Sequence, residues 1–300
     1  MLTRCAVDKE LTEQLKRVLT SLERLLPRST SPVVWRENIA AIWRRQALGG
    51  YLEPVQGGAV MRLDDLLGIE RQKDMVVENT RQFLAGYPAN NVLLWGTRGT
   101  GKSSLVRALL HSYADQGLRV VQVDKSDLVN LPDIVDQIRN EPYRFIIFAD
   151  DVSFETGESS YKVLKSALDG SVYAPSDNVI IYVTSNRRHL LPEYESDNRG
   201  AMLVNNEIHH GESVEEKISL SGRFGLWVGF HPFTQDQYVE VTRLWVERLC
   251  GLNGVVCEWN GELAKEAIDW SHVKGDRSGR ISWQFANQWV GRMMLKGSEK

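Results

Sequence analysis

Residues 91–104 read NVLLWGTRGTGKSS, and this stretch decides the fold. The apolar run over residues 92–95 predicts a buried strand, and SSLVRALL after it predicts a helix. Between them, residues 96–103 fit the pattern G-x-x-x-x-G-K-[ST] at every fixed position. A strand, a glycine-rich turn and a helix in this order predict a loop whose backbone N–H groups surround phosphate oxygens. Both flanks argue against a chance glycine-rich turn.

The residue types of this loop suit a nucleoside triphosphate. The amino end of the helix adds a partial positive charge, and Lys102 is a mobile cation able to reach the β- and γ-phosphates. The hydroxyl of Ser103 can bind Mg²⁺. The sequence therefore predicts a nucleotide-binding set made of Gly96, Thr97, Arg98, Gly99, Thr100, Gly101, Lys102, Ser103 and Ser104.

A second apolar run ends in two acidic residues. RFIIFADD, residues 144–151, predicts a strand followed by Asp150 and Asp151. Asp150 would hold Mg²⁺ through water, and Asp151 stands where a base could orient the attacking water. The alternative is that both acids cap the next turn.

Further polar residues lie where a nucleotide site could use them. Asn186 ends the buried strand NVIIYVTS, so its amide would emerge at the same sheet edge as the phosphates. Arg223, in SLSGRFGLWV, is either a surface arginine or one that stabilises phosphoryl charge in trans. Arg277 and Arg280 lie at the start of the last helix, where either could fold over the γ-phosphate or face solvent.

The order of elements predicts an α/β domain between helical segments. Over residues 61–232, short runs rich in Val and Ile alternate with helical stretches, which indicates a parallel sheet with helices on both faces. Residues 1–60 predict a helical N-terminal extension, with a first helix expected over residues 8–26 and a second over residues 33–48. Residues 233–300 predict a small all-helical lid domain.

Composition excludes several classes of protein. Of 300 residues, 42% are hydrophobic and 25% charged, which rules out a disordered, collagen-like or fibrous chain. The net charge of −3 gives no global basic field for nucleic acid. The cysteines lack zinc spacing and predict reduced thiols. With charge at the N-terminus and no apolar stretch of membrane-span length, we expect a cytoplasmic protein without a membrane partner.

The ordered motifs of the chain resemble those of AAA+ ATPases. Walker A, Walker B, sensor 1, the arginine-finger box and sensor 2 are matched, in that order, by GTRGTGKS, IIFADD, VTSN, SGRFG and GDRSGR. LDDLLGIERQ resembles the segment that contacts adenine in that family, through Leu67, Gly68 and Ile69. The stretch from VVWRENIAAIWRR to SLSGRFGLWVGFHPF resembles, more closely, an uncharacterised bacterial AAA+ family of unknown function.

The resemblance implies a cytoplasmic ATPase that uses ATP and Mg²⁺. It implies a homo-oligomeric ring or spiral, with a hexamer as one candidate, and leaves a protein or nucleic-acid client open. The site residues it implies are Asp151, Asn186 and Arg223 for catalysis, Ser103 and Asp150 for the metal, and Arg280 or Arg277 for the lid contact.

One position departs from the family pattern. Walker B here ends Asp-Asp where the family has Asp-Glu, so the side chain of Asp151 is one methylene shorter. General-base catalysis depends on reach, so slow hydrolysis is expected, with Glu155 as a nearby substitute.

Two function classes stay open. One is an ATP-hydrolysing remodeller of a macromolecular client. The other is an ATP-dependent switch or scaffold, for example initiator- or loader-like, with slow turnover. VDKSDLVNLPD lacks the aromatic and glycine of a threading loop, and Lys125 in it could meet a phosphate backbone or be a surface lysine.

Overall fold

The structure is a computed structural model of the 300-residue chain. It describes residues 14, 16–17, 32–46, 49–55, 57, 61–154, 158–168, 176–188, 190, 202–204, 207–209 and 220–298.

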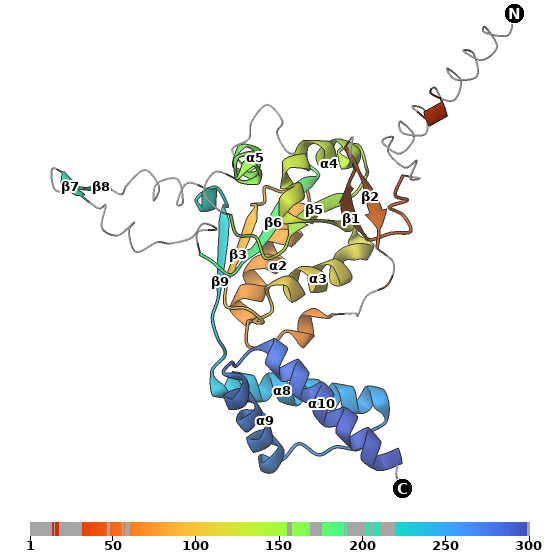
Figure 1. The fold of residues 1–300 in the computed structure, drawn as a ribbon, viewed down its shortest axis with the longest axis vertical. Coiled ribbons are helices and arrows are strands. Elements are labelled where there is room, and N and C mark those ends of the chain that lie inside the picture. The colour runs from red at the N-terminus through yellow and green to blue at the C-terminus, as the bar shows by residue number, and fades with distance from the viewer. Residues whose placement is uncertain are drawn as a thin grey trace, which may run out of the picture.

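The body of the molecule is a seven-stranded sheet with the strand order β2-β1-β4-β5-β6-β3-β9 (Figure 1). The β1–β2 pair is antiparallel, and all other neighbouring pairs in this sheet are parallel. The strands are β1 (Ala40–Arg45), β2 (Gly50–Pro54), β3 (Val92–Gly96), β4 (Leu118–Val123), β5 (Arg144–Ala149), β6 (Val179–Ser185) and β9 (Leu226–Phe230).

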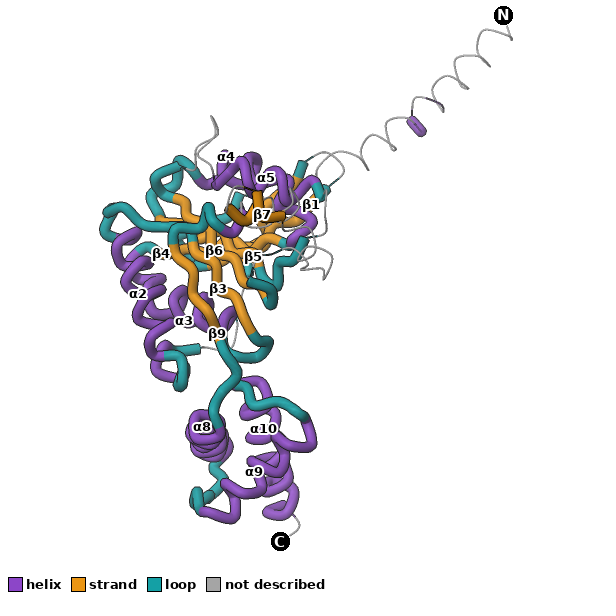
Figure 2. Tube along the Cα trace, turned by 90° about the vertical axis from the view of Figure 1, so that its left-hand side faces the viewer, coloured by secondary structure: helices purple, strands orange, loops and turns teal. Residues whose placement is uncertain are grey.

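The central strands are buried on both faces, as their continuous apolar runs predict. Every residue of β6 is buried. Helices cover both faces, so the prediction of a parallel α/β sheet is confirmed (Figure 2). One face packs against α2 (Glu70–Leu84) and α3 (Lys102–Tyr113), and the other against α4 (Leu131–Ile138) and α5 (Ser159–Leu168).

Short elements complete this part of the chain. The 3₁₀ turns are η1 (Leu63–Asp65), η2 (Ala114–Gln116) and η3 (Lys125–Asn130). A separate antiparallel pair consists of β7 (Met202–Val204) and β8 (Glu207–His209).

The lid consists of α8 (Gln235–Asn253), α9 (Gly261–Lys274) and α10 (Gly279–Ser298), and it lies below the sheet at the end of β9 (Figures 1 and 2). The Thr234 hydroxyl accepts the backbone N–H of Gln237 at 3.2 Å and so caps α8. Within the described residues, no helix combines the length and apolar character that crossing a membrane requires.

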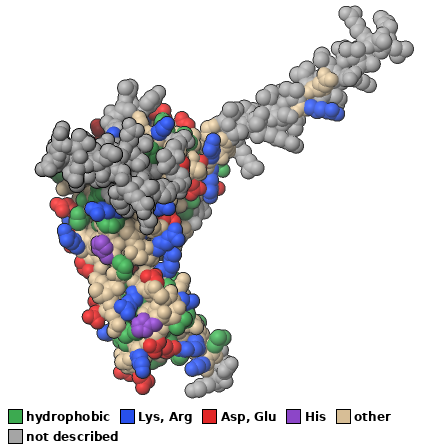
Figure 3. All heavy atoms as spheres, turned by 60° about the vertical axis from the view of Figure 1, so that its left-hand side comes forward, with side chains coloured by type: hydrophobic (Ala, Val, Ile, Leu, Met, Phe, Trp, Pro, Cys, Tyr) green, Lys and Arg blue, Asp and Glu red, His purple; other side chains and the backbone are tan. Residues whose placement is uncertain are grey.

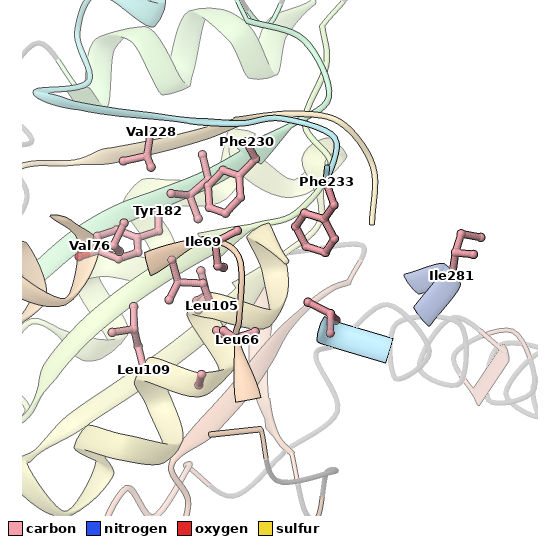
Figure 4. Close-up of a cluster of buried hydrophobic side chains, with 14 of the residues drawn as sticks. Leu66, Ile69, Val76, Leu105, Leu109, Tyr182, Val228, Phe230, Phe233 and Ile281 are labelled. Carbon is pink, nitrogen blue, oxygen red and sulfur yellow. The ribbon is translucent and has the colours of Figure 1, made fainter. Parts of the chain in front are cut away.

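The lid and the α/β body share one buried hydrophobic cluster. Figure 4 shows Leu66 and Ile69, which precede α2, together with Phe233, which follows β9, and Ile281 of α10. Because these side chains belong to one cluster, the position of the lid is coupled to the segment before α2.

The helix predicted over residues 33–48 is wrong, because residues 40–45 form strand β1. Ala41 and Trp43 are buried while their neighbours are partly exposed, which is the period of two of a strand. A short apolar run fits both the period of a helix and that of a strand. Here the segment is a strand because its backbone pairs with β4. Gly50 of β2 lies against the Trp43 indole, where a Cβ would overlap the ring.

The first helix predicted in the N-terminal extension lies largely outside the described residues. Of that stretch, residues 14, 16 and 17 are described, and they are helical. The domain boundaries at residues 60 and 232 stay predictions.

Candidate active site

The glycine-rich loop joins the end of β3 to the start of α3. The Thr97 N–H donates to the Phe230 carbonyl at 3.1 Å, which ties the loop to the end of β9. Gly96 packs so closely on Phe230 that a Cβ there would overlap the same carbonyl. Gly101 caps α3 in the left-handed region, at φ +103°, and no side chain caps the helix. The amino end of α3 therefore keeps backbone donors for an anion.

Lys102 is folded back onto its own loop. Its Nζ donates to the carbonyls of Gly96 and Thr97, both at 2.7 Å, and to Oδ1 of Asn186 at 3.3 Å. The side chain of Ser104, two residues on, is half-buried in the first turn of α3. The loop and the end of β6 thus meet at one ammonium group.

Burial and the neighbouring carboxylates shift the pKa of Lys102 in opposite directions. Burial lowers the pKa of Lys102 to about 8, and the Asp151 and Asp150 carboxylates oppose this shift. The charges of Arg280 and Arg98 act with burial to lower the pKa. A polyanion would lower the cost of the charged form.

A hydroxyl–carboxylate pair stands beside the lysine. Ser103 Oγ donates to Oδ1 of Asp150 at 2.5 Å, and the Thr184 hydroxyl donates to the same oxygen. Thr184 Oγ1 in turn accepts the Asp151 N–H at 2.8 Å. These oxygens are the kind of donor that Mg²⁺ prefers. Thr184 was not among the predicted site residues, although it lies in the quoted VTSN.

Asp151 faces the site through polar neighbours. Its Oδ1 accepts a hydrogen bond from Asn186 Nδ2, and its Oδ2 lies 3.7 Å from Arg98 Nη2. The Asp151 side chain is 62% exposed, so the Arg98 contact is weak and water can reach the carboxylate. Its φ of +50° lies in the left-handed region, which Asp adopts more readily than most residues.

The lid touches the loop at the start of α10. The Arg280 N–H donates to the Gly99 carbonyl at 3.2 Å. Arg277 instead points at His272, with 3.2 Å between Nη2 and Nε2. Of the two candidate lid arginines, the structure thus brings Arg280 to the phosphate-binding loop.

The segment expected to contact adenine lies between the loop and the lid. The Gly68 carbonyl accepts from Nε2 of Gln237 on α8 at 3.3 Å, and its N–H donates to Glu70 at 2.8 Å. Ile69 Cδ1 lies 3.2 Å from where a Cβ on Gly101 would stand. Leu67 is partly buried against the same cluster. The structure therefore places residues 67–69 beside the glycine-rich loop.

Arg223 is not brought to this site. It precedes β9, whose Leu226 pairs with Val92 and whose Phe230 pairs with Gly96. Because the strands are parallel, Arg223 lies at the amino edge of the sheet and the glycine-rich loop at the carboxyl edge. A strand rises about 3.3 Å per residue, so the length of β9 separates Arg223 from its own loop.

Two other sequence hypotheses concern acidic and basic neighbours. Lys125 Nζ pairs with Glu158 at 2.9 Å and lies 5.5 Å from the centre of the Phe154 ring. It is therefore engaged within the chain, which favours neither a free surface lysine nor a phosphate contact. Glu155 lies outside the described residues.

Comparison with known proteins places this geometry in a family. The family described as "Protein of unknown function (DUF815)" matches residues 36–293. A point mutant of RuvB from Thermotoga maritima has 17% identity and a TM-score of 0.54, over 79% of this chain and 67% of that chain.

The ORC1 protein of Aeropyrum pernix, solved in complex with DNA, has 13% identity and a TM-score of 0.50, over 73% of this chain and 58% of that chain. A search of curated proteins found no sequence match. At these identities the structural likeness establishes the fold alone. The chain belongs to the family described as "Protein of unknown function (DUF815)", and its fold is that of the AAA+ ATPases.

Proposed function

We propose that this protein binds ATP with Mg²⁺ and hydrolyses it as part of an oligomer. One observation carries the proposal: the Lys102 ammonium, the Ser103–Asp150 pair and the Asn186 amide converge beside the amino end of α3. A cation, a metal-binding oxygen pair and a helix end suit a triphosphate better than other small anions.

Binding uses groups that the chain already holds in place. Lys102 can exchange the Gly96 and Thr97 carbonyls for phosphate oxygens without leaving the loop. The backbone N–H groups at the start of α3, which no side chain caps, add donors at the same end of the helix. Ser103 and Asp150 would hold Mg²⁺, which when bound neutralises charge on the β- and γ-phosphates.

Hydrolysis requires a group that takes a proton from water. Asp151 is the acidic side chain that is solvent-accessible and hydrogen-bonded to Asn186 at this edge. Its short side chain and its contact with Arg98 favour slow turnover. An ATP-dependent switch or scaffold is therefore the second candidate function.

The position of Arg223 supports an oligomer. An arginine at this edge of the sheet lies away from its own glycine-rich loop and can contact the phosphates of a neighbouring subunit, as arginine fingers do. Ring size stays open.

The client is a protein or a nucleic acid. The ORC1 neighbour was solved with DNA, which keeps a nucleic-acid client among the candidates. On the face drawn in Figure 3, basic and acidic side chains of the described residues are interspersed. Among the described residues on this face, that mixture forms no basic stripe for a phosphate backbone.

ATP titration of a Lys102→Ala variant by calorimetry tests the proposal. Loss of a buried charged partner costs about 2–5 kcal/mol in comparable sites, so affinity should fall at least about thirtyfold. Lys162→Ala, an exposed lysine of α5, is the matched control and should bind as the parent does. Unchanged ATP affinity in folded Lys102→Ala would contradict the assignment.

A further inference from the structure

An ion pair joins the turn before α2 to the lid. Asp65, in η1, pairs through Oδ1 with Nη1 of Arg248 on α8. The side chains are only 10% and 28% exposed. The second Asp65 oxygen accepts the backbone N–H of Arg62 at 2.8 Å. One carboxylate therefore fixes its own turn and holds the lid at the same time.

The lid holds Arg248 from its other side. The guanidinium lies 5.5 Å from the centre of the Trp245 ring, and that ring meets Trp283 of α10 edge-on at 4.8 Å. Aromatic packing limits the positions open to the arginine. Because the pair is mostly buried, it is screened less than a surface ion pair.

The turn η1, which the Asp65–Arg248 ion pair holds, is followed in the chain by residues 67–69. Lys73 of α2 donates to the carbonyls of Leu63 and Leu66, at 3.3 and 3.5 Å, which closes the turn from the body side. Gln237 of α8 holds the Gly68 carbonyl from the lid side. Residues 62–69 are thus attached to α8 at two points, Asp65 and Gly68, while Leu66 and Ile69 belong to the hydrophobic cluster shared with the lid (Figure 4).

We propose that Asp65 and Arg248 are positioning residues for the nucleoside part of the ligand. Their ion pair holds residues 67–69 at the correct depth between the glycine-rich loop and the lid, and it makes no contact with the phosphate-binding groups. The inference rests on the proposed nucleotide binding, and it assigns to the pair a selective effect on the base and ribose.

Two ligands separate this role from a general structural one. ATP contacts both ends of the site, whereas inorganic tripolyphosphate contacts the phosphate end alone. Arg248→Ala should raise the Kd for ATP about tenfold, the size expected for one lost charged hydrogen bond. The Kd for tripolyphosphate should stay within twofold of the parent value, because Lys102 and the α3 amino end are untouched.

Companion variants make the result specific. Arg248→Lys keeps a cation at α8 and should recover part of the ATP affinity. Asp65→Asn keeps the shape and an acceptor for Arg62 but removes the charge, and it should repeat the Arg248→Ala pattern. Arg243→Ala is the matched control on the same helix, because its pair with Glu247 is exposed and joins two residues of α8 itself, and it should change neither Kd.

The outcomes distinguish this inference from the proposed function. If folded Arg248→Ala and Asp65→Asn weaken both ligands equally, or weaken neither, the positioning role is wrong. If the parent binds neither ATP nor tripolyphosphate, or Lys102→Ala leaves both affinities unchanged, the proposed function fails and this inference fails with it.

Discussion

The phosphate end and the nucleoside end of the candidate site are built in different ways. At the phosphate end, Lys102, Asp150 and Asn186 each follow an apolar strand, and their hydrogen bonds stay within the α/β body. At the nucleoside end, residues 62–69 are held by α8 of the lid. The first end is set by the sheet, and the second depends on where the lid lies.

This difference predicts which changes act on chemistry and which on affinity. Residues at the sheet edge should alter turnover or all phosphate binding. Residues at the contact between α8 and residues 62–69 should alter nucleoside affinity and leave phosphate binding unchanged. Arg223 belongs to neither end of the site. Changing it therefore tests whether a neighbouring subunit supplies an arginine to the phosphates.

Arg223→Ala should have the largest effect on turnover. An arginine supplied in trans is worth roughly 10³–10⁵ in rate in well-studied phosphoryl-transfer enzymes. ATP affinity should stay close to that of the parent, because the side chain lies at the opposite edge of the sheet. Phosphate release and ATP titration on the same preparation check both statements.

Mixing two inactive variants tests whether Arg223 acts in trans. At an ATP concentration that saturates only the parent site, a Lys102→Ala subunit stays largely empty but can lend its arginine, and an Arg223→Ala subunit holds ATP but lends nothing. The mixture should regain part of the activity. A mixture that co-assembles and stays inactive would show that Arg223 acts within its own subunit or only structurally.

Asp151→Asn should come next in size. The amide cannot accept the proton from water, so the hydrolysis rate should fall by about 10²–10⁴. ATP binding should be retained, because Ser103, Asp150 and Lys102 are unchanged. Single-turnover hydrolysis with saturating protein checks the rate. Turnover at the parent rate would show that Asp151 is not the base. An ATP-dependent switch or scaffold would then lose its support, which is slow turnover through the short Asp151 side chain.

The phosphate end could be predicted from sequence because its residues lie just after β5 and β6 or in the glycine-rich motif that follows β3. Parallel strands bring their carboxyl ends to one edge, so the position of each polar residue in the chain also gave its position in space. Thr184 was not predicted as a site residue, because a threonine inside a buried strand has the same sequence pattern as any other β-branched residue. Its hydrogen bonds to Asp150 and Asp151 appear only when β5 and β6 pair.

The remaining features depend on contacts between distant parts of the chain. The spacing of Ile39, Ile42 and Trp43 fits a helix, and only the edge of β4 makes it a strand. The choice between Arg277 and Arg280 needed the position of the lid. Asp65 resembles any acid at the start of a helix until α8 brings Arg248 to it.

Gly99→Ala should disturb the contact between the glycine-rich loop and the start of α10, with a smaller effect than the two changes above. A Cβ at Gly99 would lie 2.7 Å from Ser278 Oγ and 3.0 Å from Arg280 Cβ, so the start of α10 would have to move. We expect ATP affinity to fall by about tenfold, the equivalent of roughly 1.4 kcal/mol.

Backbone strain at Gly99 needs a matched control, since its φ is +77°. Gly117 has φ +93° and open space around it, so Gly117→Ala carries similar strain of about 1–2 kcal/mol without a lid clash. Both variants should unfold at lower urea concentration, and only Gly99→Ala should lose ATP affinity. Equal affinities would mean that the lid accommodates the added methyl group.

The smallest effect concerns acid and the lid contact. Burial acts to raise the pKa of Asp65, but the hydrogen bonds from Arg248 and the Arg62 N–H outweigh it and hold the pKa below its ordinary value of 3.8.

A carboxyl with a lowered pKa contributes stability that is complete above its unfolded pKa and lost as pH falls through the folded pKa. Asp65→Asn should therefore be less stable than the parent at pH 7, by about 2–4 °C in Tm, and the gap should begin to narrow near pH 4 and close as the pH falls through the lowered pKa of Asp65. Asp136→Asn, which removes an exposed carboxylate paired with Arg139, should show a much smaller gap at every pH. A stability gap that persists unchanged to pH 3 would mean that the shape of Asp65, and not its charge, holds the lid.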